Sequence, residues 1–159
     1  MSPQVALRKA FSAFPTGVVA VCALVDERPV GMAVNSFTSI SLDPPLVAVS
    51  VARTSSTWPT LATRGRLGMS VLGSEHEVLC RRLSARAVDR FEDAQWHATD
   101  DGAVLIDDAA LWLECEVRST FDGGDHEIVL MEVHEAETFP DVTPLVFHQS
   151  QFRELHADR

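Results

Sequence analysis

The chain has 159 residues, of which 46% are hydrophobic and 23% are charged, and its formal net charge is −10. These proportions are typical of globular proteins and argue against a disordered or fibrous class, and the length suits one domain, residues 1–159, with a sizeable core. The acidic balance disfavours nucleic acid and anionic membranes as partners, because both would repel the chain. Any phosphate that it binds must therefore be held by a local site.

The first predicted element is a short amphipathic helix, because apolar residues recur at helical spacing from Pro3 to Phe14 and Pro15 ends the run. We expect this helix to lie against the body of the protein. Residues 18–25 form a continuous apolar run that predicts a buried strand, with residues 30–34 returning as its hairpin partner.

Two further strands are predicted over residues 46–51 and 67–72, separated by a short helix at about 58–63. Ser74 to Glu77 has the Ser-x-x-Glu form of a capping box. This pattern predicts a helix that runs from Ser74 to about Ala85.

Residues 111–118 alternate between apolar and polar side chains, and a Gly-Gly turn at 121–125 leads into a strand over 128–133. Residues 145–148 form a last short strand. About seven strands and two or three short helices predict a closed antiparallel barrel with peripheral helices. Most polar motifs then fall on loops at the ends of the barrel.

Cysteine usage and hydropathy indicate where the protein works. Cys22, Cys80 and Cys115 are odd in number and form no C-x-x-C pair, which argues against a zinc site or a disulfide framework. No secretory signal is visible, and no stretch reaches the roughly 18 apolar residues of a membrane span. We expect a cytoplasmic location, with no metal ion and no membrane as partners.

The segment from Asn35 to Ser41 could contact a flat heteroaromatic ligand. Asn35, Ser36, Thr38 and Ser41 offer amide and hydroxyl groups at close spacing, which suits a ring that carries C=O and N–H groups. The same residues also suit a turn whose side chains bond their own backbone.

Residues 53–57 combine one arginine with four hydroxyl side chains just before the predicted helix at 58, an arrangement that suits a phosphate. A plain N-cap explains the hydroxyls equally well. Neither G-x-G-x-x-G nor a Walker A pattern occurs, so a Rossmann or P-loop site is excluded.

Two other motifs have a functional and a structural interpretation. His126 follows a Gly-Gly-Asp turn at the start of a strand, where it meets a ligand or is merely exposed. Arg90 and Phe91 either pack on a ligand or anchor a loop. No Ser/His/Asp triad, H-E-x-x-H or paired carboxylate stands out, so the pattern favours an enzyme whose cofactor carries the chemistry.

Together these motifs resemble the flavin reductase family, the short FMN-binding split-barrel enzymes that are reductase components of two-component monooxygenases. The resemblance covers nearly the whole chain. It rests on Leu7-Arg8-Lys9-Ala10-Phe11 with Phe14-Pro15-Thr16-Gly17-Val18, on the G-x-x-x-x-S-F-x-S-x-S-x-x-P-P-L-V pattern of residues 31–47, on Ser55-Ser56-Thr57, on Asp89-Arg90-Phe91 and on Gly124-Asp125-His126.

The resemblance implies a homodimeric split β-barrel that reduces FMN or FAD with NADH or NADPH and supplies the reduced flavin to a partner monooxygenase. The residues that it implies for the flavin are Asn35, Ser36, Phe37, Thr38, Ser41, Ser50, Ala52, Arg53, Ser55, Ser56, Thr57, Arg90 and Phe91. The residues that it implies for the nicotinamide nucleotide are His126, Phe147, His148, Gln149 and Ser150. His126 would position the nicotinamide for hydride transfer.

One segment departs from the family pattern. Gln149-Ser150 stands where relatives commonly carry Arg-Gly, so a cation that could help to bind the dinucleotide is absent. Two other functions stay open: a split-barrel enzyme that retains its flavin and acts on an organic substrate, as in the pyridoxamine phosphate oxidase group, and a flavin-binding barrel without turnover.

Overall fold

A computed structural model describes residues 1–86 and 88–156. Its largest element is a seven-stranded sheet in which every neighbouring pair is antiparallel. In spatial order the strands are β3 (Arg28–Val34), β2 (Val19–Val25), β6 (Leu67–Val71), β9 (Leu111–Gly123), β10 (His126–Thr138), β5 (Pro45–Ala52) and β4 (Thr38–Leu42).

Two small sheets complete the β structure. β1 (Thr16–Gly17), β11 (Leu145–His148) and β12 (Gln151–Glu154) form one, and β7 (Trp96–Ala98) pairs with β8 (Val104–Ile106) in the other. All seven predicted strands are therefore confirmed, and five more occur in the described residues. The extra strands are short or form edges, and their sequences carry little periodic signal.

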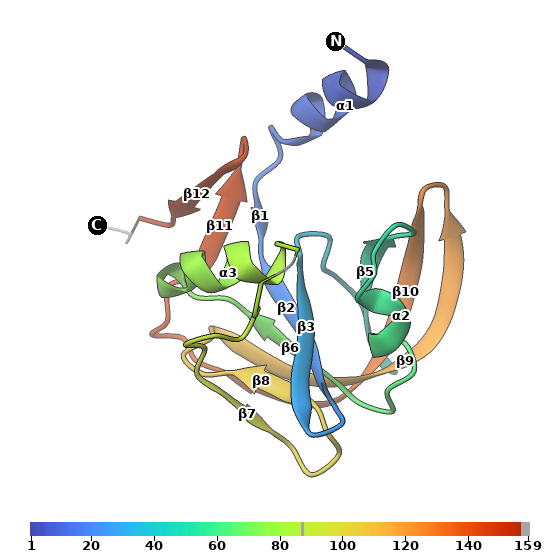
Figure 1. The fold of residues 1–159 in the computed structure, drawn as a ribbon, viewed down its shortest axis with the longest axis vertical. Coiled ribbons are helices and arrows are strands. Elements are labelled where there is room, and N and C mark those ends of the chain that lie inside the picture. Colours follow the sequence, from blue (N-terminus) through green and yellow to red (C-terminus); the bar gives the residue numbers. More distant parts are fainter. Residues whose placement is uncertain (87, 157–159) are drawn as a thin grey trace.

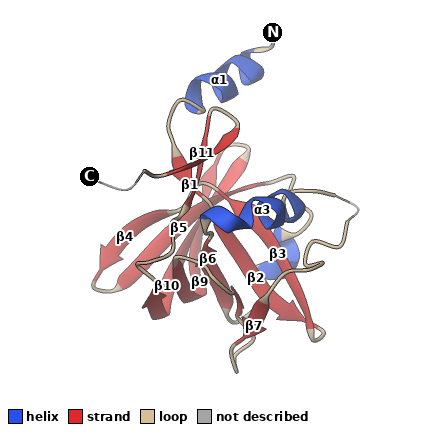
Figure 2. Cartoon of the chain, turned by 90° about the vertical axis from the view of Figure 1, so that its left-hand side faces the viewer, coloured by secondary structure: helices blue, strands red, loops and turns tan. Residues whose placement is uncertain are grey.

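The predicted closure of the barrel is wrong. The order of the seven-stranded sheet has two ends, β3 and β4, because residues 35–37 carry the chain from one edge to the other as an unpaired loop. The sheet curls around its core but stays open along this seam (Figure 2). This is the split barrel implied by the family resemblance.

The continuous apolar run of β2 reflects burial on both faces of that strand. Val19, Val21 and Ala23 pack into the core inside the sheet, whereas Ala20 and Cys22 pack into a second core on its outer face. The second core lies beneath α3 (Glu77–Leu83), which places this helix beside the end of β3 (Figure 1).

Three of the helical elements differ from their predictions. α1 (Pro3–Phe11) has no buried residue and projects away from the sheets, so the expectation that it packs on the body is wrong (Figure 1). α2 (Trp58–Leu61) is a single turn. The predicted capping box at Ser74 is replaced by a 3-10 turn, η1 (Ser74–His76), in which Nδ1 of His76 accepts from the Gly73 N–H at 2.9 Å.

A close approach of backbones joins the main sheet to the β7–β8 hairpin. A Cβ atom built on Gly68 in β6 would lie 1.9 Å from the carbonyl oxygen of Val104 in β8. Only glycine allows this contact, which brings β8 into the second core. None of the described helices is long and apolar enough to cross a membrane.

Candidate functional site

A groove of about 850 Å³ opens between the seam of the main sheet and the C-terminal hairpin. One wall is formed by the loop after β3 and the end of β5, and the other by α3, β11 and β12. This volume lies in the range of small-molecule sites, about 300–1,000 Å³. The predicted site residues that line it are Asn35, Ser36, Ser50, Ala52, His126, Phe147 and Ser150.

A smaller pocket of about 240 Å³ adjoins the groove, because Met32, Ala33, Ala52 and Ser84 line both. Three of the residues predicted for the phosphate, Ser55, Ser56 and Thr57, line this pocket together with Arg90, which was predicted to close over the flavin. The structure thus brings the two predicted halves of the site together. A ligand with a flat ring and a phosphate tail would fit such a pair of connected cavities.

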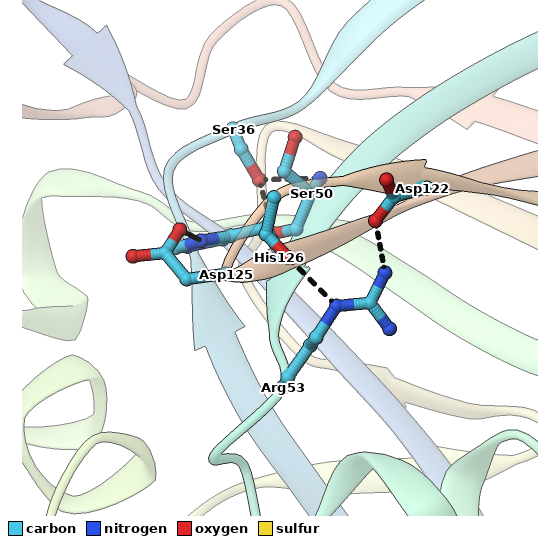
Figure 3. A network of polar contacts seen from close by, with 7 residues as sticks. Ser36, Ser50, Arg53, Asp122, Asp125 and His126 are labelled. Carbon is cyan, nitrogen blue, oxygen red and sulfur yellow. Dashed lines mark hydrogen bonds and ion pairs between the residues drawn. The ribbon is translucent and has the colours of Figure 1, made fainter.

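Ser36 fixes the loop at the mouth of the groove (Figure 3). Its hydroxyl donates to the Ser50 carbonyl at 2.8 Å and accepts from the Ser50 N–H at 2.9 Å. Because a hydroxyl has one proton, Ser36 can accept but cannot donate a further hydrogen bond. The side chain therefore ties the loop to β5 and does not bond the backbone of its own turn, and Asn35 lines the groove beside it.

Arg53 lines neither pocket and instead contacts the β9–β10 turn (Figure 3). Its Nη2 lies 2.6 Å from Oδ1 of Asp122, and its Nε donates to the Gly124 carbonyl at 2.8 Å. The guanidinium thereby fixes the turn that precedes His126.

His126 is the first residue of β10 and lies opposite Ala52 in β5. Its Nδ1 lies 2.7 Å from Oδ1 of Asp125, and this hydrogen bond holds the pKa of the Asp125 carboxyl below its ordinary value. With Nδ1 engaged by the carboxylate, Nε2 remains available to a ligand in the groove.

The hydroxyls after β5 are partly used within the protein. Ser55 Oγ accepts from the Trp58 N–H at 3.1 Å and so satisfies the first N–H of α2, whose N-cap residue, Thr57, makes no capping hydrogen bond with its side chain. Thr57 Oγ1 accepts from Nη1 of Arg90 at 2.9 Å. The hydroxyls of Ser55 and Thr57 thus have partners within the protein, and a role of this segment in binding phosphate stays a prediction.

Arg90 connects three segments around the smaller pocket. Besides Thr57, its guanidinium donates to the carbonyls of Ala85 and Gly31, each at 2.9 Å. Phe91 packs into the second core, and a Cβ on Gly31 would lie 2.9 Å from its ring. Phe91 thus anchors the loop, while Arg90 reaches the pocket.

The C-terminal hairpin supplies an aromatic wall. Phe147 and Phe152 are paired across β11 and β12, with ring centroids 5.5 Å apart. Gln149 and Ser150 form the turn between them and have φ values of +52° and +61°, as in a type I′ turn. Ser150 lines the groove, whereas the Gln149 N–H donates to the Ser12 carbonyl beneath α1.

Other predicted site residues lie outside both pockets. Phe37 packs against the core inside the sheet, and Thr38 and Ser41 belong to the edge strand β4. Nδ1 of His148 accepts from Nε of Arg153 at 3.1 Å.

Sequence reasoning missed the wall formed by α3, where Glu77, Cys80, Arg81 and Ser84 line the groove. Helical spacing puts Glu77, Arg81 and Ser84 on one face, which is the signal that could have indicated them. Burial raises the pKa of the Cys80 thiol to about 11, so it stays protonated near neutral pH. The described residues hold no group of three or more His, Cys, Asp or Glu side chains arranged for a metal ion.

Comparison with known proteins gives one matching family. Residues 11–156 match the family described as a flavin reductase like domain. This span includes all residues that line the groove and the smaller pocket.

Three similar proteins have been named or solved. The chain is 39% identical to an FMN reductase (NADH), SmoA, of Agrobacterium fabrum, over 91% of this chain and 82% of the relative. The structure of the Streptomyces globisporus NADH:FAD oxidoreductase SgcE6 in complex with NAD and FAD fragments superposes with a TM-score of 0.92 at 36% identity, covering 98% and 94% of the two chains. The styrene monooxygenase flavin reductase of Pseudomonas putida S12 superposes with a TM-score of 0.85 at 35% identity, covering 96% and 98%.

Proposed function

Since this chain belongs to the flavin reductase-like domain family, we propose that it reduces FMN or FAD with NADH or NADPH and supplies the reduced flavin to a monooxygenase. NAD(P)H, a proton and oxidised flavin give NAD(P)⁺ and reduced flavin, with the hydride passing from the nicotinamide to the flavin. Relatives named as an FMN reductase, an NADH:FAD oxidoreductase and a styrene monooxygenase flavin reductase support this proposal.

The observation that carries the proposal is the connection between the groove and the smaller pocket. The groove has amide and hydroxyl groups on one wall and aromatic rings on the other, and the smaller pocket adds hydroxyls and the Arg90 guanidinium. The groove thus suits a flat polar ring, and the adjoining pocket suits a phosphate attached to it. The residues present therefore fit a flavin nucleotide.

The side chains in this site bind and orient. Asn35 and Ser50 would meet the ring, Ser56 and Arg90 the phosphate, and Phe147 would form a platform for the second ring. Alignment of two rings at reacting distance supplies most of the acceleration, so no side chain needs to change its protonation state in the hydride step.

His126 would position the nicotinamide through Nε2, because its Nδ1 is held by Asp125. Replacing His126 by alanine should raise KM for NADH by roughly tenfold, as expected for the loss of one polar contact to a ligand. The flavin dissociation constant should change by less than about twofold, because Nε2 would contact the nicotinamide rather than the flavin ring. Steady-state kinetics and flavin fluorescence titration measure the two quantities.

The matched control is His134→Ala, because His134 pairs with Glu116 at 3.0 Å and does not line the groove. Its KM should stay at the wild-type value. If His126→Ala weakens flavin binding alone, the positioning role is wrong.

The exposed helix α1 supports a homodimer. Leu7, Phe11 and Phe14 are exposed to 53%, 71% and 76%, and Leu42 on the edge strand β4 to 95%. Apolar side chains exposed in this number mark an interface. We infer that a second copy of the chain covers them.

The wild-type protein should sediment at twice the monomer mass of 17.4 kDa. Phe11→Asp should sediment at the monomer mass, because a charge would be buried without a partner in the dimer. Analytical ultracentrifugation distinguishes the two. A dimer that is unchanged by Phe11→Asp would place the interface elsewhere.

A cytoplasmic location is consistent with the three free, buried thiols of Cys22, Cys80 and Cys115. Under this proposal the reductase serves its monooxygenase through diffusing reduced flavin.

The deciding experiment is NADH and NADPH oxidation at 340 nm by the purified protein, with and without added FMN or FAD. Turnover that depends on added flavin supports the reductase. Stoichiometric bound flavin without turnover of free flavin would indicate the enzyme that retains its cofactor, and binding without any turnover would indicate the non-catalytic barrel.

A further inference from the structure

The α3 wall of the groove carries a cation that no motif accounts for. Arg81 is the only Arg or Lys among the described residues that line the groove. It lies on the wall with Phe147 and Phe152, opposite the polar loop that would meet the flavin ring. This inference rests on the proposed function, under which that wall faces the nicotinamide dinucleotide.

Two contacts hold the Arg81 guanidinium in place. Its Nη2 lies 2.7 Å from Oε1 of Glu77, one helical turn away, and its central carbon lies 5.2 Å from the centroid of the Phe152 ring. Arginine has five N–H donors in a planar fork, and the carboxylate of Glu77 occupies only part of them. The guanidinium is thus oriented and keeps donors for an anion.

The other arginines near the groove do not line it: Arg86 and Arg90 line the adjoining pocket, and Arg8 lies beside the Gln149-Ser150 turn. Arg53 is bound to Asp122 at the β9–β10 turn, and Arg153 donates to His148. The Gln149-Ser150 turn has no charge of its own. In a chain with a net charge of −10, a dinucleotide with two phosphates needs a local cation.

We propose that Arg81 binds the phosphates of the nicotinamide dinucleotide and so supplies from α3 the charge that the Gln149-Ser150 turn lacks. Glu77 orients the guanidinium and at the same time competes with the phosphates for it. Removing the charge of Arg81 should therefore weaken dinucleotide binding, whereas removing the charge of Glu77 should strengthen it.

The test measures binding of NAD⁺ to flavin-free protein by isothermal titration calorimetry, together with KM for NADH. Arg81→Gln should weaken both by roughly tenfold, the effect of losing a charge-assisted contact. Arg81→Lys keeps the charge but not the fork and should fall in between. Glu77→Gln should tighten binding severalfold, and the double variant should behave like Arg81→Gln.

The matched control is Arg82→Gln, which removes the neighbouring charge of the same helix. Arg82 donates to the Glu92 carbonyl and does not line the groove, so its affinity for NAD⁺ should stay at the wild-type value. Affinity for flavin should be unchanged in all variants.

Three outcomes would overturn the inference: equal effects of Arg81→Gln and Arg82→Gln, a weakening by Glu77→Gln that matches Arg81→Gln, or an unchanged affinity in Arg81→Gln. A loss in Arg8→Gln alone would instead assign the role to the pocket that Arg8 and Lys9 form with the turn. If wild-type protein reduces no flavin, the proposed function fails first. If the wild-type protein reduces flavin and Arg81→Gln leaves the affinity for NAD⁺ unchanged, only the role of Arg81 fails.

Discussion

Replacing Arg90 by alanine should lower the affinity for FMN by at least about tenfold, because the guanidinium would contact the phosphate and also shapes the pocket that receives it. Its three hydrogen bonds join Gly31, Thr57 and Ala85 at the smaller pocket. Without them the loop after α3 and the hydroxyl segment lose their connection. Fluorescence titration of flavin measures the affinity.

The control for Arg90 is Arg64→Ala, since Arg64 is exposed and its guanidinium donates to the neighbouring Thr63 hydroxyl, away from both pockets. This variant should bind FMN like the wild type. Arg90→Lys should recover part of the affinity, because a point charge still attracts phosphate. Wild-type affinity for FMN in Arg90→Ala would remove Arg90 from the phosphate site.

Gly68→Ala should destabilise the protein by about 3 kcal/mol or more, at the upper end of overpacking effects. The added Cβ would lie 1.9 Å from the carbonyl oxygen and 2.6 Å from the carbonyl carbon of Val104. Both are backbone atoms, so no rotamer change relieves the clash. β8 would have to move away from β6, and Val104 and Ile106 would leave the second core.

Urea denaturation gives the free energy of unfolding of Gly68→Ala and Gly65→Ala. The comparison separates the clash with Val104 from the general effect of replacing glycine. A Cβ on Gly65 meets nothing within 4 Å. Gly65→Ala should therefore change the free energy of unfolding by less than about 0.5 kcal/mol. Similar values for the two variants would show that the approach of β6 to β8 contributes little.

The strands with strong apolar patterns could be predicted from the sequence nearly to the residue. The run at 18–25 became β2 (Val19–Val25), and the run at 46–51 became β5 (Pro45–Ala52). A strand buried on both faces has a continuous apolar run, and a strand buried on one face alternates apolar and polar residues, so both can be recognised in the sequence. Local turns such as Gly124-Asp125 were also readable, because Gly124 needs its positive φ of +76°.

Features that depend on distant contacts left no such trace. β4 has mostly exposed residues and exists because it pairs with β5, so the sequence alone predicts a polar loop at this position. Arg53 sits in a segment typical of phosphate sites, yet its charge is satisfied by Asp122, 69 residues later. The α3 wall was missed because its contact with the groove arises only when β11 and β12 fold beside it.

The order of strands in the main sheet also bears on how the chain folds. The β2–β3, β4–β5 and β9–β10 pairs are hairpins between neighbours in sequence, whereas β5 and β10 come from distant parts of the chain. Hairpins form within microseconds, and long-range pairing is slower because a large loop must be closed first. The groove needs the loop after β3, the end of β5 and the start of β10 together. Competence to bind ligand is thus acquired at a late, non-local step, and flavin fluorescence would report on completion of refolding rather than on its onset.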